Sequence, residues 1–223
     1  PARPRAILLV SGHWEAADFT VHVGDRPPLL FDYHGFPPHT YQLRWDAPGA
    51  PDVARRAADL LRGGGFTTRE ETARGWDHGV FIPMKVALPD ADIPLAQLSL
   101  RRDLDPAVHI AAGRALAPLR DEGVLIIGSG MSFHNLRVRG PQAIAPSTAW
   151  DYALTAAATD ADPDQRAARV AAWADLPHAR FAHPREEHLL PLMVALGAGD
   201  RSPATCTHRS SVLGWTVSGY RFG

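Results

Sequence analysis

The chain has 223 residues, of which 45% are hydrophobic and 21% are charged, and its formal net charge is −1 at pH 7. This length and composition are typical of one globular domain with enough apolar side chains for a sizeable core. The near-zero charge argues against a nucleic-acid partner, and no apolar run is long enough to predict a membrane span. The single cysteine excludes an intramolecular disulfide, and we expect a cytoplasmic protein.

Short apolar runs alternate with helical patterns through the first half of the chain. Residues 6–10 form a brief, fully apolar run that favours a buried strand, and residues 19–23 alternate as a second strand. The proline-rich residues 27–49 predict a long irregular segment, which we expect to cover a functional site. The other elements expected here are a helix over 52–61, a strand over 66–70, a helix over 80–88 and a strand over 95–100.

The alternation of strands and helices continues to the end of the chain. Residues 106–120 predict a helix, and the apolar residues 124–127 predict another buried strand. Helices are also expected over 150–159, 163–176 and 188–196, and we expect residues 204–208 and 213–218 to close the edge of the sheet. The pattern predicts an α/β fold: a three-layer sandwich with a central, mostly parallel or mixed sheet flanked by helices on both faces.

Four histidines stand in short contexts unlike ordinary core packing. His13 follows the first apolar run in a Ser-Gly-His-Trp segment, and His134 follows the run at 124–127 and a Gly-Ser-Gly turn. His78 lies in Gly-Trp-Asp-His-Gly, and His188 opens an apolar pattern after two glutamates. Side chains just past strand ends converge on ligands in open α/β sheets. Imidazole binds transition metals and moves protons near neutral pH, so the set indicates a metal site with acid/base residues.

Each context also has a simpler structural interpretation. His13 could be a half-buried turn histidine. Asp77 either orients His78 or caps the helix that follows. Glutamates in a first helical turn are favoured by the helix dipole, but Glu187 is the first alternative ligand if the site has two histidines and one carboxylate. The glycines before His134 could serve tight packing rather than ligand binding.

The remaining candidates carry less weight. Arg137 could bind a substrate carboxylate, although a surface salt bridge is the usual fate of an arginine. Cys206 is expected to be a small buried apolar residue. The other histidines are expected to be structural or surface groups: His22, His34, His39, His109, His178, His183 and His208.

The chain resembles the class III extradiol ring-cleavage dioxygenases, the LigB-like superfamily, and within it the branch of 4,5-DOPA dioxygenase-like proteins. The resembling segments include Phe-Asp-Tyr-His-Gly-Phe-Pro-Pro from residue 31 and the contexts of the four histidines. They cover most of the chain in the order and spacing of the family: residues 6–14, 31–49, 75–79, 89–100, 119–137 and 186–199.

The resemblance implies a catalytic domain with Fe(II) as its working metal, and Zn(II) is another ion that the imidazoles could bind. By resemblance, the metal ligands are His13, His188 and, in this branch, also His134. His134 is assigned acid/base catalysis first and metal contact second, and His78 is expected to place or deprotonate the substrate. The implied reaction is non-haem Fe(II)-dependent extradiol cleavage of a catechol-type, DOPA-like substrate with O2. A zinc-dependent hydrolase on the same scaffold and a non-enzymatic metal-binding member are the alternatives.

One departure from the family pattern lies at the start of the chain. The family carries another metal-binding histidine in a Gly-His-Gly-Ser-Pro-like turn after its first strand, and no such motif precedes residue 6. We expect that this N-terminal strand and its histidine are missing here, and that residues 1–223 form a single catalytic domain without them. The expected partners are a small catechol and O2, with no nucleic acid and no membrane; the oligomeric state stays open.

Overall fold

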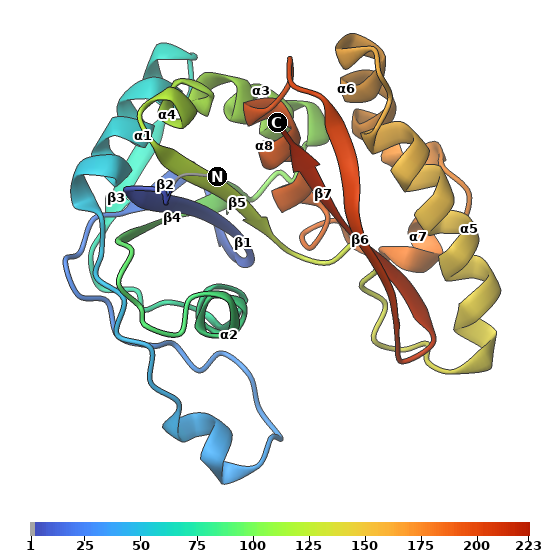
Figure 1. Cartoon of the computed structure of the whole chain (residues 1–223), viewed down its shortest axis with the longest axis horizontal. Helices are drawn as coiled ribbons and strands as arrows, with labels where there is room; N and C mark the ends of the chain where they lie inside the picture. Colours follow the sequence, from blue (N-terminus) through green and yellow to red (C-terminus); the bar gives the residue numbers. More distant parts are fainter. Residues whose placement is uncertain (1–2) are drawn as a thin grey trace. The chain divides into compact units, whose positions relative to one another are not determined.

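The computed structural model describes residues 3–223, and its internal contacts divide the chain into two compact units (Figure 1). Unit 1 contains the residues up to Asp103 together with Pro118–Ser129, and unit 2 contains Leu104–Ala117 and Gly130–Gly223. The expectation of a single catalytic domain over residues 1–223 stays a prediction.

In the described part of unit 1, a five-stranded sheet has the order β3-β2-β4-β1-β5. Its strands are β1 (Ala6–Ala16), β2 (Phe19–His22), β3 (Thr68–Glu71), β4 (Leu95–Arg101) and β5 (Val124–Ser129). The central strand β1 pairs in parallel with β4 and β5, and β2 pairs in parallel with β3. Only the β2–β4 pair is antiparallel, at Val21 and Leu98, so the sheet is mixed. The run at 6–10 forms β1 because a short, fully apolar segment suits a strand that is buried on both faces.

Helices flank the two faces of this sheet (Figure 1). Ile7 and Leu9 of β1 pack in one core cluster with α2 (His78–Ala87). Successive side chains of a strand point to opposite faces, so Leu8 and Val10 face the other side. There, α1 (Pro51–Gly63) buries an apolar face against β2 and β4, and α4 (Pro118–Asp121) packs against β5. The predicted α/β fold with a central mixed sheet flanked by helices is confirmed.

Helix α2 contains Pro83 and nevertheless continues to Ala87, as the sequence predicts. Proline has no N–H, so the carbonyl of Gly79, four residues earlier, loses its usual helical partner. The hydroxyl of Ser129 at the end of β5 donates a hydrogen bond to that carbonyl. A side chain from the neighbouring strand thus replaces the missing backbone donor.

Unit 2 is mainly helical. Its helices are α3 (Pro106–Leu116), α5 (Pro141–Ala158), α6 (Pro163–Ala171), the 3-10 helix η2 (Trp173–Asp175), α7 (Ala179–Ala182) and α8 (Leu190–Ala198). Several bounds differ from the predicted ones because proline sets them. The expected helix over 106–120 is interrupted before Pro118, which cannot continue the backbone pattern, and α5 begins at Pro141 rather than near residue 150. α8 starts at Leu190, so Pro191 lies in its first turn and His188 precedes the helix.

The last two strands do not close the edge of the central sheet, so that prediction is wrong. β6 (Ala204–Val212) and β7 (Trp215–Phe222) form their own antiparallel two-stranded sheet, and β7 packs against α5. Leu213 and Gly214 connect them with φ angles of 55° and 89°. A two-residue turn with positive φ at both positions joins neighbouring antiparallel strands directly, so β6 takes β7 as its partner.

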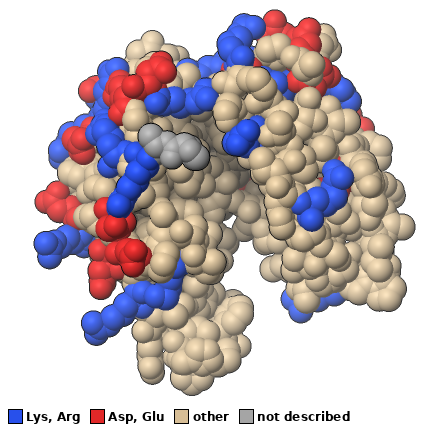
Figure 2. Space-filling view, in the orientation of Figure 1, with Lys and Arg blue, Asp and Glu red and all other residues tan. Residues whose placement is uncertain are grey.

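Charged residues on the surface are mixed in sign. In the space-filling view, acidic and basic side chains are interspersed over the region of α1 and β3 (Figure 2). Ion pairs there join Arg55 to Glu70, Arg62 to Asp59 and Arg69 to Asp18. Among residues 3–223, no helix combines the length and apolar composition that crossing a membrane requires.

Candidate metal and catalytic residues

His13 stands where β1 departs from regular pairing. β1 pairs with β4 as far as Val10, and the pairing resumes only at Glu15, so the Ser-Gly-His-Trp segment forms a bulge. Bulges redirect side chains away from the regular pleat. Ser11 and His13 both approach Gly79 in the first turn of α2. The bulge therefore brings the His13 imidazole beside the N-terminus of α2.

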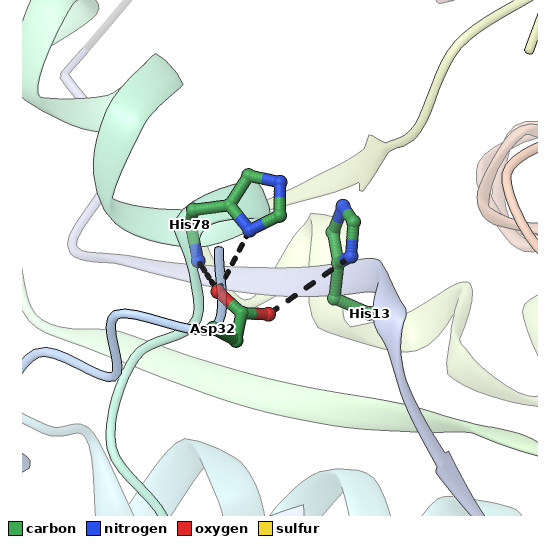
Figure 3. A group of neighbouring side chains, drawn as sticks. All are labelled: His13, Asp32 and His78. Atoms are coloured by element: carbon green, nitrogen blue, oxygen red, sulfur yellow. Dashed lines mark hydrogen bonds and ion pairs between the residues drawn. The ribbon is translucent and has the colours of Figure 1, made fainter. Parts of the chain in front are cut away.

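Asp32 lies between the imidazoles of His13 and His78 (Figure 3). Its Oδ1 atom accepts hydrogen bonds from the backbone N–H of His78 at 3.0 Å and from the Nδ1 atom of His78 at 2.7 Å. Its Oδ2 atom lies 3.9 Å from Nδ1 of His13, and the centroids of the two imidazole rings are 3.9 Å apart. Asp32 is absent from the predicted site residues, although the Phe-Asp-Tyr-His-Gly segment around it carries part of the family resemblance.

The proline-rich loop reaches His78 because its backbone is hydrogen-bonded to the segment before α2. The N–H of Trp76 donates to the carbonyl of Pro28 at 2.8 Å, and the N–H of Leu30 donates to the carbonyl of Trp76 at 2.7 Å. Trp76 is itself fully buried in the core of unit 1. These bonds fix the loop two residues before Asp32, so the carboxylate arrives beside His78.

Asp77 neither orients His78 nor caps α2 with its side chain, so both interpretations from the sequence are wrong. It is the N-cap residue of α2, but its fully buried carboxylate makes no capping hydrogen bond in the described part of the chain. Instead it accepts hydrogen bonds from the Ser11 hydroxyl at 2.7 Å, the Gln97 amide at 2.6 Å and Arg74 Nη2 at 3.2 Å. Arg74 Nη2 also donates to the carbonyl of His13 at 3.1 Å. Asp77 therefore ties the bulge of β1 and strand β4 to the start of α2.

Unit 2 holds a second group, formed by His134, Glu187 and His188. The two imidazole rings are stacked with their centroids 3.4 Å apart and their planes inclined by 16°. Glu187 Oε1 lies 2.8 Å from Nδ1 of His188 and 3.6 Å from Nδ1 of His134. In both units a carboxylate therefore faces the Nδ1 atoms of two histidines.

The second group forms because two loop segments of unit 2 are joined along their backbones. The hydrogen bonds run from Met131 N–H to the carbonyl of His188 at 3.0 Å, from His134 N–H to the carbonyl of Ala182 at 3.0 Å, and from the Asn135 amide to the carbonyl of Phe181 at 2.7 Å. A Cβ atom on Gly130 would overlap the carbonyl oxygen of His188. This glycine therefore serves close packing, and the packing sets His134 beside His188.

Neighbouring histidines keep the carboxyl groups of Asp32 and Glu187 in the ionised form. Burial raises the pKa of the Asp32 carboxyl, but the hydrogen bonds from His78 outweigh burial and leave the pKa below its ordinary value. Burial likewise raises the pKa of the Glu187 carboxyl, but the neighbouring imidazoles of His134 and His188 hold that pKa well below its usual range. Each group thus places a negative charge among imidazole nitrogens, which is a donor set suited to a divalent cation.

Comparison with known proteins shows which family the chain belongs to. The model of the catalytic LigB subunit of aromatic ring-opening dioxygenase matches residues 1–223. The chain belongs to this family. The sequence-based prediction of the family is thereby confirmed, and so is the predicted enzyme class, an extradiol ring-cleavage dioxygenase.

Several known proteins are similar to the chain over most of their own length. The chain is 42% identical to a 4,5-DOPA dioxygenase extradiol of Beta vulgaris, over 93% of this chain and 78% of that protein. It is 39% identical to dioxygenase tasH of Hapsidospora irregularis, over 99% of this chain and 72% of that protein. The crystal structure of the uncharacterized protein JW3007 from Escherichia coli K12 is similar with a TM-score of 0.82 and 30% identity, covering 98% of this chain and 86% of that one.

The LigB family implies a metal cofactor, and the residues present fit one. In each group, two imidazoles and one carboxylate bring potential ligand atoms within 4.8 Å of one another. Among the described residues, the buried Oε2 atom of Glu187 has no hydrogen-bond partner. Its ionic contact is with Arg185 Nη1 at 3.4 Å, and Oε2 can still accept a further interaction from a bound cation. Nitrogen and oxygen donors of this kind bind several divalent transition metals.

His183, which the sequence predicts to be a structural or surface group, lies in an apolar environment in unit 2. It is fully buried, and its ring lies within about 6 Å of the rings of Trp150 and Trp173. Its Nε2 atom lies 3.0 Å from the carbonyl of Ser132, which also accepts a hydrogen bond from Trp150. Burial lowers the pKa of His183 to about 4. His183 is therefore a neutral structural group in the folded protein at pH 7.

We expect His183 to make the free energy of unfolding fall as the pH is lowered. Between the unfolded pKa, about 6.5, and the folded pKa of about 4, the unfolded chain binds a proton that the folded chain does not. The stabilisation is therefore present above this window and is lost through it, by about 2–3 kcal/mol between pH 7.5 and pH 4.5. Urea unfolding of metal-free protein at the two pH values measures the loss.

The matched variant for this measurement is His183→Gln, because a glutamine amide can still donate to the carbonyl of Ser132 but does not titrate. Other groups titrate equally in both proteins, so the wild type should lose more stability on acidification than the variant. An equal loss in the two proteins would show that His183 is not the titrating group.

The remaining predicted residues lie apart from these groups or are exposed. His34, His39 and Arg137 are exposed, while His22 and His109 are buried. Cys206 is half-buried rather than buried, since strand β6 lies in a hairpin with one accessible side.

Proposed function

We propose that the chain is a non-haem Fe(II)-dependent extradiol dioxygenase that cleaves the aromatic ring of a catechol-type, DOPA-like substrate with O2. The observation that carries the proposal is the similarity to several proteins named 4,5-DOPA dioxygenase extradiol, at 35–42% identity and with high coverage. The two groups of histidines and carboxylates support it, because the proposed reaction needs both a metal and proton transfer.

We propose His13, His134 and His188 as the metal ligands, on the strength of the family resemblance. His134 and His188 meet within unit 2, and His13 belongs to unit 1. Bound Fe(II) would supply the redox chemistry that O2 requires, together with open coordination positions for O2 and the diol. Zn(II) would occupy the same imidazoles but has no redox chemistry.

The proposed proton transfers belong to His78 and His134. His78 would accept a proton from a catechol hydroxyl, which makes the ring more electron-rich. His134 would move a proton during ring opening, at the Nε2 atom, since its Nδ1 atom faces Glu187. A positioned acid/base group of this kind typically contributes about 10²–10⁴-fold to the rate. Metal contact is the second role proposed for His134, and the metal content of a His134 variant separates it from acid/base catalysis.

Aromatic side chains around His78 support an aromatic substrate. The Tyr33 ring lies edge-on to the His78 imidazole, with 5.6 Å between centroids. Tyr33 in turn contacts Phe36 and Phe81 at 5.3 Å and 6.3 Å between centroids. Phe81 is buried, but aromatic rings favour such offset and edge-to-face contacts with one another, so the accessible rings of Tyr33 and Phe36 suit a catechol ring better than an aliphatic group.

The test is oxygen consumption by protein loaded with Fe(II) under anaerobic conditions and then supplied with air-saturated buffer and one of several catechols, including DOPA. We expect uptake of O2 together with a new yellow absorbance from an open-chain semialdehyde. The matched control is the same protein loaded with Zn(II), which should consume no O2. Absence of uptake by protein that measurably holds Fe(II), with every catechol tried, would overturn the proposal.

A further inference from the structure

We propose that Asp32 is a positioning residue, which holds the His78 imidazole with its proton on Nδ1 and thereby leaves Nε2 as the atom that accepts a proton. The inference rests on the proposed function in one respect, the assignment of proton transfer to His78. The placement of the imidazole proton is independent of that assignment and can be measured without any reaction.

The hydrogen bonds of Asp32 determine the position of the proton. Asp32 Oδ1 accepts the backbone N–H of His78 at 3.0 Å, and a carboxylate at neutral pH can only accept hydrogen bonds. The Nδ1 atom of His78, 2.7 Å from Asp32 Oδ1, must therefore be the donor. Among the described residues, Nε2 of His78 has no hydrogen-bond partner, and about a third of the side chain is exposed, at 31%. In neutral imidazole one nitrogen donates and the other accepts, so Nε2 is the accepting atom.

The orientation of the ring is fixed as well as its proton. Asp32 Oδ1 bonds both the backbone N–H and the Nδ1 atom of His78, so one oxygen sets the side chain relative to its own backbone. Tyr33, the next residue of the same loop, packs its ring edge-on against the imidazole. The loop itself is held to Trp76 by backbone hydrogen bonds on both sides of that residue. A carboxylate that orients a base in this way is a recurring arrangement in acid/base catalysis.

Two other roles for Asp32 must be separated from positioning. Because the side chain of Asp77 is committed to Ser11, Gln97 and Arg74, Asp32 accepts the first N–H of α2 and could simply stabilise the helix start. Asp32 also lies with His13 and His78 in a group whose atoms could hold a metal directly. Helix stabilisation predicts a change in stability alone, and direct ligation predicts a loss of bound metal.

The experiment compares wild type with Asp32→Ala and Asp32→Asn, and Asp90→Asn is the control. Asp90 is an exposed carboxylate of unit 1, so its replacement changes the net charge without touching the group. The asparagine variant keeps an oxygen that can accept both hydrogen bonds from His78, whereas alanine removes them. Protein with ¹⁵N-labelled histidine is studied without metal at a pH above 8, and the His78 signals are assigned by their loss in His78→Gln.

We expect the proton on Nδ1 of His78 in wild type, in Asp32→Asn and in Asp90→Asn, and a shift of the population toward Nε2 in Asp32→Ala. In Fe(II)-loaded protein we expect kcat of Asp32→Ala to be lower by about 10²-fold at equal metal content, with a smaller change in KM and a smaller loss in Asp32→Asn. The control should match wild type in every readout.

Three outcomes would overturn the positioning role. The first is a wild-type proton on Nε2, and the second is a kcat of Asp32→Ala within twofold of wild type despite reduced stability. The third is metal content in Asp32→Ala that falls in step with activity, because Asp32 would then be a ligand. If wild type has the Nδ1 proton but is inactive toward every catechol, the proposed function fails while the placement of the proton stands.

Discussion

Replacement of His134 by alanine is expected to lower kcat for catechol cleavage by about 10²–10⁴-fold. The variant removes the imidazole that is proposed to move a proton but keeps the backbone N–H of residue 134, which donates to the carbonyl of Ala182. The loop around residue 134 should therefore keep its conformation. Steady-state oxygen uptake by Fe(II)-loaded protein measures the change, and His208→Ala, an exposed histidine of the same unit, is the matched control.

Metal content distinguishes the two roles assigned to His134. If the residue acts as acid or base, the variant should bind metal with the same stoichiometry as wild type and lose only kcat. If it is a ligand, metal content should fall together with activity, and Glu187 and His188 would be left with one donor fewer. Activity within twofold of wild type at full metal content would contradict both roles.

Replacement of Asp77 by alanine is expected to lower the free energy of unfolding by about 3–5 kcal/mol. The carboxylate is fully buried and accepts hydrogen bonds from Ser11, Gln97 and Arg74. Its removal leaves buried donors without an acceptor and a cationic guanidinium without its counter-charge, both of which cost free energy. Urea unfolding followed by tryptophan fluorescence measures the loss, because the core of unit 1 contains Trp45 and Trp76.

The control for this prediction is Asp90→Ala, which removes an exposed carboxylate from the same unit and should change stability by less than about 0.5 kcal/mol. Asp77→Asn keeps the size of the side chain and one acceptor. Its loss of unfolding free energy should therefore lie between the losses of Asp90→Ala and Asp77→Ala. A loss below about 1 kcal/mol in Asp77→Ala would mean that water or a rearranged Arg74 satisfies the donors. We also expect weaker metal binding in Asp77→Ala, because the same contacts hold the bulge that carries His13.

Local sequence patterns were sufficient for much of the fold. The strands at 6–10 and 95–100 could be predicted from their apolar residues, and both are buried in the sheet. The strand at 124–127 also forms, but β5 is the edge strand and Leu125 is 47% exposed, so the expectation of a buried strand there is wrong. Helix α1 could be predicted because Val53, Ala57 and Leu61 recur on one helical face, and they are buried in the structure. The histidines were found from their positions after strands and turns and from the family resemblance. Their catalytic and metal-binding roles stay predictions.

Other features could not be predicted because no local pattern encodes them. Asp32 reads as an ordinary loop residue, and only the hydrogen bonds of the loop to Trp76 bring it to His78. Asp77 matches a helix cap in the sequence, yet the burial of Ser11 and Gln97 beside it gives its carboxylate stronger partners. The last two strands show a strand pattern that does not indicate which strand they pair with.

The resemblance of its motifs indicated the family and drew attention to the histidines of interest, and periodicity within a few turns of chain determined the α/β alternation. The tertiary structure decided which carboxylate is hydrogen-bonded to which imidazole. Asp32 is 46 residues from His78, and Ser11 is 66 residues from Asp77. Such pairs form only when the sheet and its loops have packed, since the hydrogen-bonding partner of a charged side chain is set by the groups that the fold brings beside it.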